Sequence, residues 1–531
     1  MPDDSVFTFA DDEEREICAF LRDPATYAAG DQQVEVVETH IARVFLVGDD
    51  AYKLRKRVHL RFVDFSTLHA RHAAAVREME INRPHAPNIY LGLVPIVRAE
   101  DGRFQLGGRG EIVEWAVHMR RFPQEAVLAR REERGRLSEN LAKALADMVA
   151  RYHQDSPIAE AVSGERIMAA VVDQLSSALS YGYAEVAQRL VAAFERIGPL
   201  LTERGNAGCV RRCHGDLHLG NIVLIDNHPV PFDALEFSEA LATIDVLYDL
   251  AFLLMDLDAR GDRHAANVVF NAYTAFEPIG GEIEGMACLP LFLACRAGVR
   301  AVVAMARSEQ LEPHAQTELR AEIRRNALLA RAYLSPPPPQ LIAIGGLSGT
   351  GKSTLAAQIA PHVGSAPGAL HVRSDVERKR LFGVPETQRL DRQHYRIGTA
   401  QRVYSIVEDK AKRALAARHA VIVDAVFAKQ EERAAVEAIA HEAGCAFVGL
   451  WLTAPEDTLI ARVEGRRGDA SDADRRVVRE QLGYDLGEIA WRQVDASGTL
   501  EHSLGEARRT LTEAGVIPPP QEADADATTC Q

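Results

Sequence analysis

A run of prolines divides this chain into parts that must fold separately. Ser335 is followed by proline at each position from 336 to 339. Proline has a fixed φ and no backbone N–H, so it cannot continue the Ala- and Arg-rich helix that precedes the run. With 531 residues the chain is also too long for one core. We expect two folded modules, residues 1–334 and 340–515, joined by a spacer at 335–339.

The end of the chain has a different composition. Prolines 518–520 precede an acidic segment that reaches Gln531 and contains few apolar side chains. Such a segment cannot bury enough apolar surface to offset the entropy of ordering it. We therefore expect residues 516–531 to be a disordered acidic tail.

Composition and charge limit the classes of partner. The net charge of -15 argues against nucleic acid or an anionic membrane surface and favours small molecules. The longest apolar stretch, 286–306, contains Arg296 and Arg300, which favours a buried helix over a membrane span. Residues 1–5 are acidic and unlike a secretory signal, so a cytoplasmic location is expected. No feature of the sequence identifies a protein partner.

The seven cysteines are scattered along the chain without paired C-x-x-C spacing. An odd number without such pairs indicates neither a disulfide framework nor a zinc site.

The second module alternates short apolar runs with helical stretches. The runs lie at residues 341–344, 370–372, 420–423 and 446–452. Strands that alternate with helices pair in parallel, with helices on both faces of the sheet. The module is therefore predicted to have an α/β fold with a doubly wound parallel sheet.

A phosphate-binding motif follows the first of these runs. Residues 346–353 satisfy G-x-x-x-x-G-K-[ST], and they stand between an apolar strand and the start of a helix. In this motif backbone N–H groups wrap phosphates at a helix N-terminus, Lys352 reaches the outer phosphates and Ser353 takes magnesium. The residues predicted to bind the nucleotide are Gly346, Ser348, Gly349, Thr350, Gly351, Lys352, Ser353 and Thr354.

Charged residues after the later strands complete this prediction. Asp375 follows the second strand, where it is expected to bind or deprotonate the acceptor. Asp424 ends the third strand and is expected to bind magnesium or its water. A basic cluster before Asp469 is predicted to close over the phosphates as a lid, with a solvated helix face as the alternative. Its arginines are Arg462, Arg466 and Arg467, of which Arg462 and Arg466 are predicted to be catalytic.

The first module has a small sheet lobe before a larger helical lobe. Expected strands lie at 42–47, 51–55, 90–97 and 112–120, and expected helices at 70–82 and from 137 onward. The first two strands form a hairpin around the turn at 48–50.

The helical lobe contains a second phosphoryl-transfer motif. Residues 214–221 read His-Gly-Asp-Leu-His-Leu-Gly-Asn, and Phe-Asp-Ala follows at 232–234. In a kinase catalytic loop an Asp takes the acceptor proton while an Asn and a later Asp hold magnesium. Asp216 is therefore predicted to be the base, and Asn221 and Asp233 the metal ligands. An ordinary polar turn is the alternative.

The hairpin is expected to supply a lysine for the nucleotide. Ala51 and Lys53 lie on one face of the second strand, so Ala51 can contact adenine while Lys53 reaches phosphate. Lys56 points to the opposite face and is the second choice. Glu78 on the following helix is predicted to pair with Lys53, with solvated surface charges as the alternative for both residues.

With these residues in place, residues 34–334 resemble the aminoglycoside phosphotransferase family, which has an α+β protein-kinase-like bilobal fold. Its motif H-G-D-x-H-x-x-N is matched by His214, Asp216, His218 and Asn221, with Asp233 following, and residues 248–251 are similar to its next helix motif. The resemblance implies that Asp216 is the base and that Asn221 and Asp233 bind magnesium.

Two features limit what this resemblance implies. No G-x-G-x-x-G precedes Lys53, so a different phosphate-covering loop is expected, around residues 39–42. The family also contains kinases of many hydroxylated metabolites, so an antibiotic acceptor does not follow. Glu236, Glu239 and Asp256 would suit a cationic acceptor, although a solvated acidic face is the preferred interpretation.

Residues 340–515 resemble the small P-loop kinases, which include gluconate-type, polynucleotide-type and zeta-toxin-like enzymes. The resemblance implies that Asp375 contacts or deprotonates the acceptor and that lid arginines steady the transferred group. The joined architecture resembles bacterial proteins described as aminoglycoside phosphotransferase-like with a C-terminal ATP-binding domain.

The prediction is a bifunctional phosphotransferase in which each module binds ATP and magnesium and phosphorylates a hydroxyl of a small molecule. Two alternatives stay open. One or both modules bind nucleotide without turnover, as regulatory modules, or the second module is a zeta-toxin-like nucleotide-sugar kinase.

Overall fold

The computed structural model describes residues 9–27, 33–39, 41–60, 63–130, 136–160, 162–309 and 316–518. The chain divides by its contacts into two compact units. Unit 1 is Met1–Ile167 with Gly205–Asp256, and unit 2 is Met168–Arg204 with Leu257–Gln531. Helices from both sides of the proline run belong to unit 2, and the predicted module boundary at 335–339 stays a prediction. Residues 1–5 and the tail from 519 onward lie outside the described residues.

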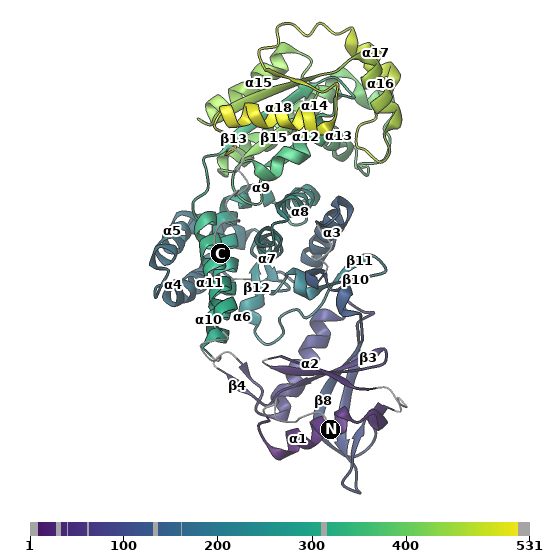
Figure 1. Ribbon diagram of the computed structural model, residues 1–531, viewed down its shortest axis with the longest axis vertical. Coiled ribbons are helices and arrows are strands. Elements are labelled where there is room, and N and C mark those ends of the chain that lie inside the picture. Colours follow the sequence, from purple (N-terminus) through teal and green to yellow (C-terminus); the bar gives the residue numbers. More distant parts are fainter. Residues whose placement is uncertain are drawn as a thin grey trace, which may run out of the picture. The chain divides into compact units, whose positions relative to one another are not determined.

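Unit 1 contains an antiparallel sheet (Figure 1). Its six strands follow the order β1-β2-β3-β8-β6-β7. Their bounds are β1 Glu35–Glu38, β2 Ala42–Val47, β3 Asp50–Arg55, β6 Tyr90–Arg98, β7 Phe104–Leu106 and β8 Glu111–Arg120. The four strands predicted from the sequence are found here, each within one residue of its expected ends.

Two helices cover this sheet. Helix α1 (Asp12–Arg22) packs Ile17 and Leu21 against Phe45 and Leu54 of the sheet. Helix α2 (Leu68–Asn82) begins at Thr67, whose side chain accepts a hydrogen bond from the N–H of Ala70. Helix α2 therefore starts with a capped N-terminus, as helices favour.

The rest of unit 1 combines helices with three short two-stranded sheets. The helices are α3 Glu139–Asp155, α6 Glu239–Ala242 and most of α7 Val246–Ala259. The strand pairs are β4 His59–Leu60 with β5 Val63–Asp64, β9 Val210–Arg212 with β12 Thr243–Asp245, and β10 Ile222–Ile225 with β11 His228–Pro231. Asp226 and Asn227 both have positive φ, of 50° and 63°, and turn β10 into β11.

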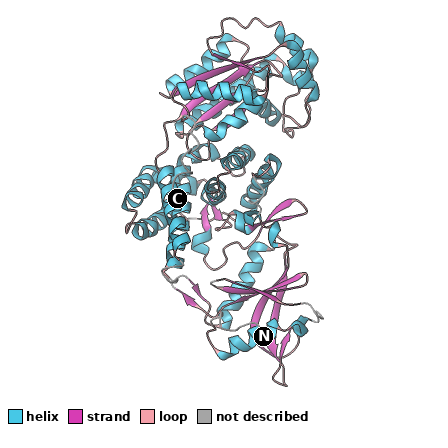
Figure 2. Cartoon of the chain, viewed as in Figure 1, coloured by secondary structure: helices cyan, strands magenta, loops and turns pink. Residues whose placement is uncertain are grey.

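Unit 2 contains a parallel sheet, drawn magenta among cyan helices in Figure 2. Its five strands follow the order β14-β15-β13-β16-β17. The strands are β13 Gln340–Gly346, β14 Leu370–Arg373, β15 Val421–Asp424, β16 Ala446–Thr453 and β17 Arg492–Asp495. Every neighbouring pair is parallel. The predicted parallel sheet is confirmed, and β17 escaped prediction because its short sequence Arg-Gln-Val-Asp has no apolar run.

Helices lie on both sides of this sheet. They are α12 Lys352–Ile359, α13 Ser374–Leu381, α14 Ile397–Ala416, α15 Gln430–Glu442, α16 Glu456–Gly465, α17 Arg475–Leu482 and α18 Leu500–Glu513. Buried residues of β13, β15 and β16 form one core with α12 and α18. The strands read as continuous apolar runs because helices cover both faces of the sheet.

Further helices of unit 2 precede the proline run. They are α5 Ala184–Asn206, α8 Arg263–Phe276, α9 Glu282–Gly285, α10 Leu289–Ser308 and α11 Thr317–Tyr333, with most of α4 Gly164–Leu179. Within the described residues, the stretch Glu282–Ser308 has the length and mean hydropathy, 1.7, of a membrane span, but 67% of its apolar window is buried inside the chain. A buried helix was the prediction for this segment.

Two glycines allow tryptophan rings to lie against the parallel sheet. A Cβ atom on Gly449 of β16 would lie 2.4 Å from Cγ of Trp491. A Cβ atom on Gly345 of β13 would lie 2.8 Å from Cε3 of Trp451. The Trp491 ring is also held by its Nε1–H, which donates to Glu437 Oε1 at 2.6 Å. A side chain at position 449 therefore has no room unless the indole moves.

We expect Gly449→Ala to lower the free energy of unfolding by about 1 to 3 kcal/mol, because overpacking forces a rigid ring or the backbone to shift. Gly505→Ala on α18 is the matched control, since among the described residues no heavy atom lies within 4 Å of its Cβ position. That change should be neutral or stabilise by up to about 1 kcal/mol. Urea unfolding of both variants measures the difference, and equal midpoints would contradict the packing argument.

Candidate active sites

Lys53 of β3 is the centre of the site in unit 1. Its Nζ lies 2.8 Å from Glu78 Oε1 on α2 and 2.5 Å from Asp233 Oδ1. Lys53 is 9% exposed and Glu78 is fully buried. Burial alone would lower the pKa of Lys53, but Asp233 and Glu78 outweigh it and raise the pKa above its usual value. Lys53 is therefore held as a cation facing Asp233, and the predicted pairing with Glu78 is present.

A second buried cation shares Glu78. Arg55 Nη2 contacts Glu78 Oε2 and lies 2.5 Å from Glu236 Oε1. Arg55 is two residues from Lys53 and on the same face of β3, as strand geometry requires. Lys56, the second choice of the sequence analysis, points elsewhere and pairs with Glu38. Arg55 was missed because nothing in the sequence shows that two cations share one carboxylate.

The loop at 214–221 brings its polar side chains together. Asn221 Nδ2 donates to Asp216 Oδ2 at 2.8 Å and to Asp216 O at 3.0 Å. His218 Nε2 lies 3.3 Å from the same carboxylate oxygen. His214 Nε2 lies 3.0 Å from the carbonyl oxygen of Phe232, which joins the loop to the segment of Asp233. The Asp216 side chain is 40% exposed, so it is open to an acceptor.

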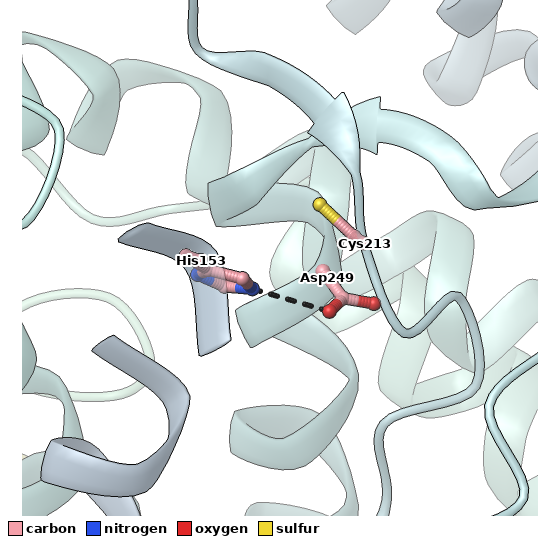
Figure 3. A group of neighbouring side chains, drawn as sticks. All are labelled: His153, Cys213 and Asp249. Carbon is pink, nitrogen blue, oxygen red and sulfur yellow. Dashed lines mark hydrogen bonds and ion pairs between the residues drawn. The ribbon is translucent and has the colours of Figure 1, made fainter. Parts of the chain in front are cut away.

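A buried cluster under the loop consists of His153, Cys213 and Asp249 (Figure 3). Asp249 accepts hydrogen bonds from the backbone N–H of His214 at 3.3 Å and of Gly215 at 2.9 Å. His153 Nε2 lies 3.1 Å from Asp249 Oδ2, the contact drawn as a dashed line. The ligating atoms of the three residues lie within 4.8 Å of one another. Because the loop amides already occupy the Asp249 carboxylate, we interpret the cluster as an anchor of the loop.

Asp233 is held in a strained backbone conformation. Its φ is 58°, in the left-handed region that costs energy for residues other than glycine. Its N–H donates to the Tyr90 hydroxyl at 3.0 Å, and the N–H of Ala234 donates to Asn82 Oδ1 at 2.9 Å. Burial would raise the pKa of Asp233, but Lys53 outweighs it and lowers the pKa below its usual value. Asp233 is therefore an ionised carboxylate that faces Lys53.

The three acids considered for a cationic acceptor already have partners. Glu236 is paired with Arg55. Glu239 contacts Arg77 at 2.7 Å and Arg212 at 3.0 Å. Asp256 accepts the N–H of Leu219 at 3.0 Å. The predicted phosphate-covering segment at 39–42 includes position 40, which lies outside the described residues, and the N–H of Thr39 donates to Ala42 O at 2.9 Å.

Unit 2 has a cavity of about 1640 Å³ at the carboxyl end of its sheet. Residues from the P-loop, the strand ends and the lid line it, among them Ser348, Gly351, Lys352, Ser353, Thr354, Asp375, Asp424, Arg466 and Arg467. Open parallel sheets bind ligands at this end. Among the described residues, Arg462 does not line the cavity, and its Nη2 donates to Gly498 O at 2.9 Å. Of the two arginines predicted to be catalytic, the structure therefore brings Arg466 to the cavity and leaves Arg462 outside it.

Glycines shape the P-loop. Gly346, Gly349 and Gly351 have φ of 138°, 92° and 89°. A Cβ atom on Gly349 would lie 2.7 Å from the carbonyl oxygen of Leu459. Lys352 Nζ donates to Leu347 O at 3.1 Å, so the side chain bends back over its own loop. Burial lowers the pKa of Lys352, although Asp424 and Asp375 oppose this effect.

Two carboxylates in the cavity have opposite pKa shifts. Burial raises the pKa of Asp375 above its usual value, although Arg378, Lys352 and Arg373 oppose it. Burial would also raise the pKa of Asp424, but His371, Lys352 and Arg373 outweigh it and bring the pKa to about 2. Asp424 Oδ2 lies 3.5 Å from His371 Nε2 and is buried without a hydrogen bond among the described residues. Asp424, ionised and with an oxygen that lacks a hydrogen bond within the described part of the chain, is therefore suited to bind a cation. Asp375, a carboxyl group with a raised pKa, is suited to transfer a proton.

The lid is joined to the cavity through ion pairs that the sequence analysis did not predict. Arg373 Nη2 lies 2.8 Å from Asp469 Oδ1. Asp472 Oδ2 lies 2.6 Å from Lys379 Nζ and accepts the Tyr395 hydroxyl at 2.6 Å. Lys379 is completely buried. The sequence did not indicate a role for Lys379 or Asp472, because a lysine on a charged helix is expected to be exposed unless its partner is known.

Each site thus combines a lysine with carboxylates, and each matches a family model. Residues 34–286 match the phosphotransferase enzyme family and residues 341–484 match the AAA domain model. The chain is therefore made of two kinase-like domains. The predicted fold class, an α+β protein-kinase-like domain followed by an α/β P-loop domain, is confirmed.

The chain belongs to a family of proteins that join these two domains. The uncharacterized proteins Rv2004c of Mycobacterium tuberculosis and Mb2027c of Mycobacterium bovis are each 30% identical to it over 494 residues. Each alignment covers 89% of this chain and 94% of the relative. The whole architecture, and not only one domain, is therefore shared.

Solved structures resemble one part of the chain at a time. A choline/ethanolamine kinase family protein from Mesorhizobium loti is 15% identical, covering 60% of this chain and 94% of its own, with a TM-score of 0.38. A gluconokinase from Sinorhizobium meliloti 1021 is 22% identical, covering 33% of this chain and 93% of its own, with a TM-score of 0.25. Aminoglycoside 2′-phosphotransferase-IIIa is 13% identical, covering 59% of this chain and 98% of its own, with a TM-score of 0.36.

We expect Glu78→Gln to destabilise unit 1 by about 3 kcal/mol, because it removes one of the anions that balance two buried cations. The matched control is Glu80→Gln on the same helix, since the Glu80 side chain is 57% exposed and its ion pair with Arg77 lies at the surface. The control should change stability by less than about 1 kcal/mol. Thermal unfolding measures both, and equal melting temperatures would show that Glu78 does not balance these charges.

Proposed function

We propose that this protein is a bifunctional phosphotransferase with two ATP sites, each transferring the γ-phosphoryl group to a hydroxyl of a small molecule. The observation that carries the proposal is the repeated arrangement of a lysine, a carboxylate fit to hold a cation and a second carboxylate open to an acceptor. In unit 1 these are Lys53, Asp233 and Asp216. In unit 2 they are Lys352, Asp424 and Asp375. We also propose the cytoplasm as the location, because it supplies ATP.

In unit 1 the proposed base is Asp216. Its carboxylate takes the acceptor's hydroxyl proton as the oxygen attacks the γ-phosphorus, and the bond from phosphorus to the bridging oxygen of ADP breaks. Asn221 orients Asp216 by donating to its Oδ2 at 2.8 Å. Lys53 would bind phosphate oxygens, and Glu78 keeps its ammonium group directed into the site. The Asp249 anchor fixes the loop that carries Asp216.

In unit 2 the proposed acceptor residue is Asp375. It follows β14, lines the cavity and has a pKa that burial raises above its usual value, which favours a role in proton transfer. The backbone of the P-loop and Lys352 would hold the phosphates. Arg466, which also lines the cavity, would balance the charge of the transferred group.

The residues in both sites fit magnesium, which binds through oxygen ligands. In unit 1 the carboxylate of Asp233 and the amide oxygen of Asn221 would hold it. In unit 2 the hydroxyl of Ser353 and Asp424 would hold it, and the buried Asp424 Oδ2 without a hydrogen bond among the described residues supports this assignment. Bound magnesium neutralises phosphate charge in such sites.

The two-site proposal predicts that single variants lose separate activities. We expect Asp216→Ala to lower transfer at unit 1 by about 10² to 10⁴ fold, as for loss of a general base. Lys352→Ala should remove transfer at unit 2, and the double variant should have neither activity. The measurement is mass spectrometry of a metabolite extract incubated with ATP, which also identifies the acceptors.

Matched controls for these changes lie at exposed positions. The Asp147 and Lys412 side chains are 40% and 54% exposed. Asp147→Ala and Lys412→Ala should leave all products unchanged. If both site variants retained every product, the two-site proposal would be wrong. If ATP bound tightly to both sites but no acceptor consumed it, nucleotide binding without turnover would be the better account.

Removal of magnesium gives an independent test. We expect chelation by EDTA to stop both transfers. Asp233→Asn should raise the magnesium concentration needed for the products that depend on Asp216, and Asp424→Asn should do so for those that depend on Lys352. A loss of oxygen charge weakens magnesium binding at that site only. An unchanged magnesium requirement in both variants would contradict the assigned ligands.

A further inference from the structure

Strand β14 lies at one edge of the parallel sheet. Its inner side pairs with β15, and the N–H of Leu370 donates to Ala420 O at 2.9 Å. The backbone groups of Ala369 and His371 alternate with these and point to the open side. Unpaired backbone groups at a covered edge cost free energy, so they need partners. The strand matters because it leads directly into Arg373 and Asp375.

Helix α8 supplies those partners. Asn271 Oδ1 accepts the N–H of His371 at 2.7 Å, and Asn271 Nδ2 donates to Ala369 O at 3.2 Å. Asn267 Nδ2 donates to the same carbonyl oxygen at 3.1 Å. Asn267 and Asn271 are four residues apart and so lie on one face of the helix. The Asn271 amide has one donor and one acceptor side, so it replaces a neighbouring strand at this edge.

The surrounding contacts are close and polar. Gly368 has a φ of 114°, and a Cβ atom there would lie 2.8 Å from Asn267 Nδ2. The Phe270 ring lies 5.2 Å from that of His419, whose Nε2 lies 3.0 Å from Gly368 O. Asn267 is only 3% exposed. The same Cβ atom on residue 368 would lie 2.4 Å from Ala360 O, so glycine lets the segment before β14 pass close both to residues 360–361 and to Asn267.

Ion pairs extend the contact to the helix that carries Asp375. Lys410 Nζ lies 3.0 Å from Glu277, just beyond α8, and 3.0 Å from Glu377 on α13. Arg413 makes two contacts with Glu284 of α9, at 2.5 and 3.0 Å. The α8 to α9 segment therefore contacts β14 directly and reaches α13 through Lys410.

We propose that Asn271 is a positioning residue of the P-loop site, which holds β14 so that Asp375 faces the cavity. Helix α8 lies within residues 34–286, the range matched by the phosphotransferase family model. The P-loop site, in residues 341–484, therefore depends on Asn271, which belongs to the range matched by the phosphotransferase family model. The inference rests on the proposed function of unit 2 for its catalytic consequence, but the hydrogen bonds stand without it.

The test compares Asn271→Ala with Asn140→Ala in full-length protein. Asn140 is exposed on α3, so it is a matched control. Hydrogen exchange followed by mass spectrometry reports peptides that cover residues 369–376. We expect Asn271→Ala to exchange about tenfold faster there, since His371 N–H loses its acceptor, while β16 stays unchanged. Unchanged exchange at 369–376 would overturn the proposal.

Catalysis gives a second readout that general loss of structure would not imitate. The protein carries Asp216→Ala so that only the P-loop site turns over Mg-ATP, with water as acceptor. We expect Asn271→Ala to lower kcat about tenfold while the Kd of ATP changes less than about twofold, because the P-loop connects β13 to α12 and is not part of β14. Equal loss of affinity and turnover would overturn the positioning role.

Glu277→Gln keeps the proposal testable if Asn271→Ala does not fold. The Glu277 side chain is 48% exposed, and its change breaks only the chain of ion pairs through Lys410. Faster exchange at residues 374–381 with unchanged ATP affinity would support the proposal, and unchanged exchange would overturn it. If the parent protein had no Mg-ATP turnover, the proposed function would fail while the exchange result still decided the contact.

Discussion

The charge on a lysine must be balanced at each site, and much of the surrounding structure follows from this constraint. Lys53 meets two carboxylates, and one of them is shared with Arg55. Lys352 donates a hydrogen bond to a backbone carbonyl oxygen, and Asp424 and Asp375 act on its pKa through their charge alone. A buried cation without such partners would cost several kcal/mol. Both sites therefore carry their own anions, and a nucleotide that enters must compete with or displace them.

The sequence predicted well what depends on local pattern. The strand periods and the P-loop spacing are local, so β2, β3, β6, β8, β13, β14, β15 and β16 and the lysines of both sites were found. It predicted poorly what depends on pairs distant in the chain. Arg55 with Glu236, Asp249 with Gly215 and Lys379 with Asp472 are separated by tens to hundreds of residues. No single-sequence pattern joins such partners.

The lid arginines show that sequence pattern also fails to distinguish residues that are near one another in the chain. Arg462, Arg466 and Arg467 stand within six positions of one another, and a helical pattern alone would treat them alike. Helix α16 ends at Gly465, so Arg462 stays on the helix while Arg466 and Arg467 follow its end and turn into the cavity. The end of the helix, and not the composition of the cluster, separates the three side chains.

The proline spacer and the asparagine contacts of α8 both restrict how far the edge strand β14 can move from α8. Prolines 336–339 in an extended conformation span about 12 Å, and they join the end of α11 to the start of β13 within unit 2. A spacer that is short and stiff keeps the effective concentration of the α8 face near the sheet edge high. A few hydrogen bonds then suffice to hold β14, because little translational freedom is lost when they form. A long flexible linker would make the same hydrogen bonds cost more conformational freedom, so the short proline spacer and the asparagine contacts of α8 support one another at this sheet edge.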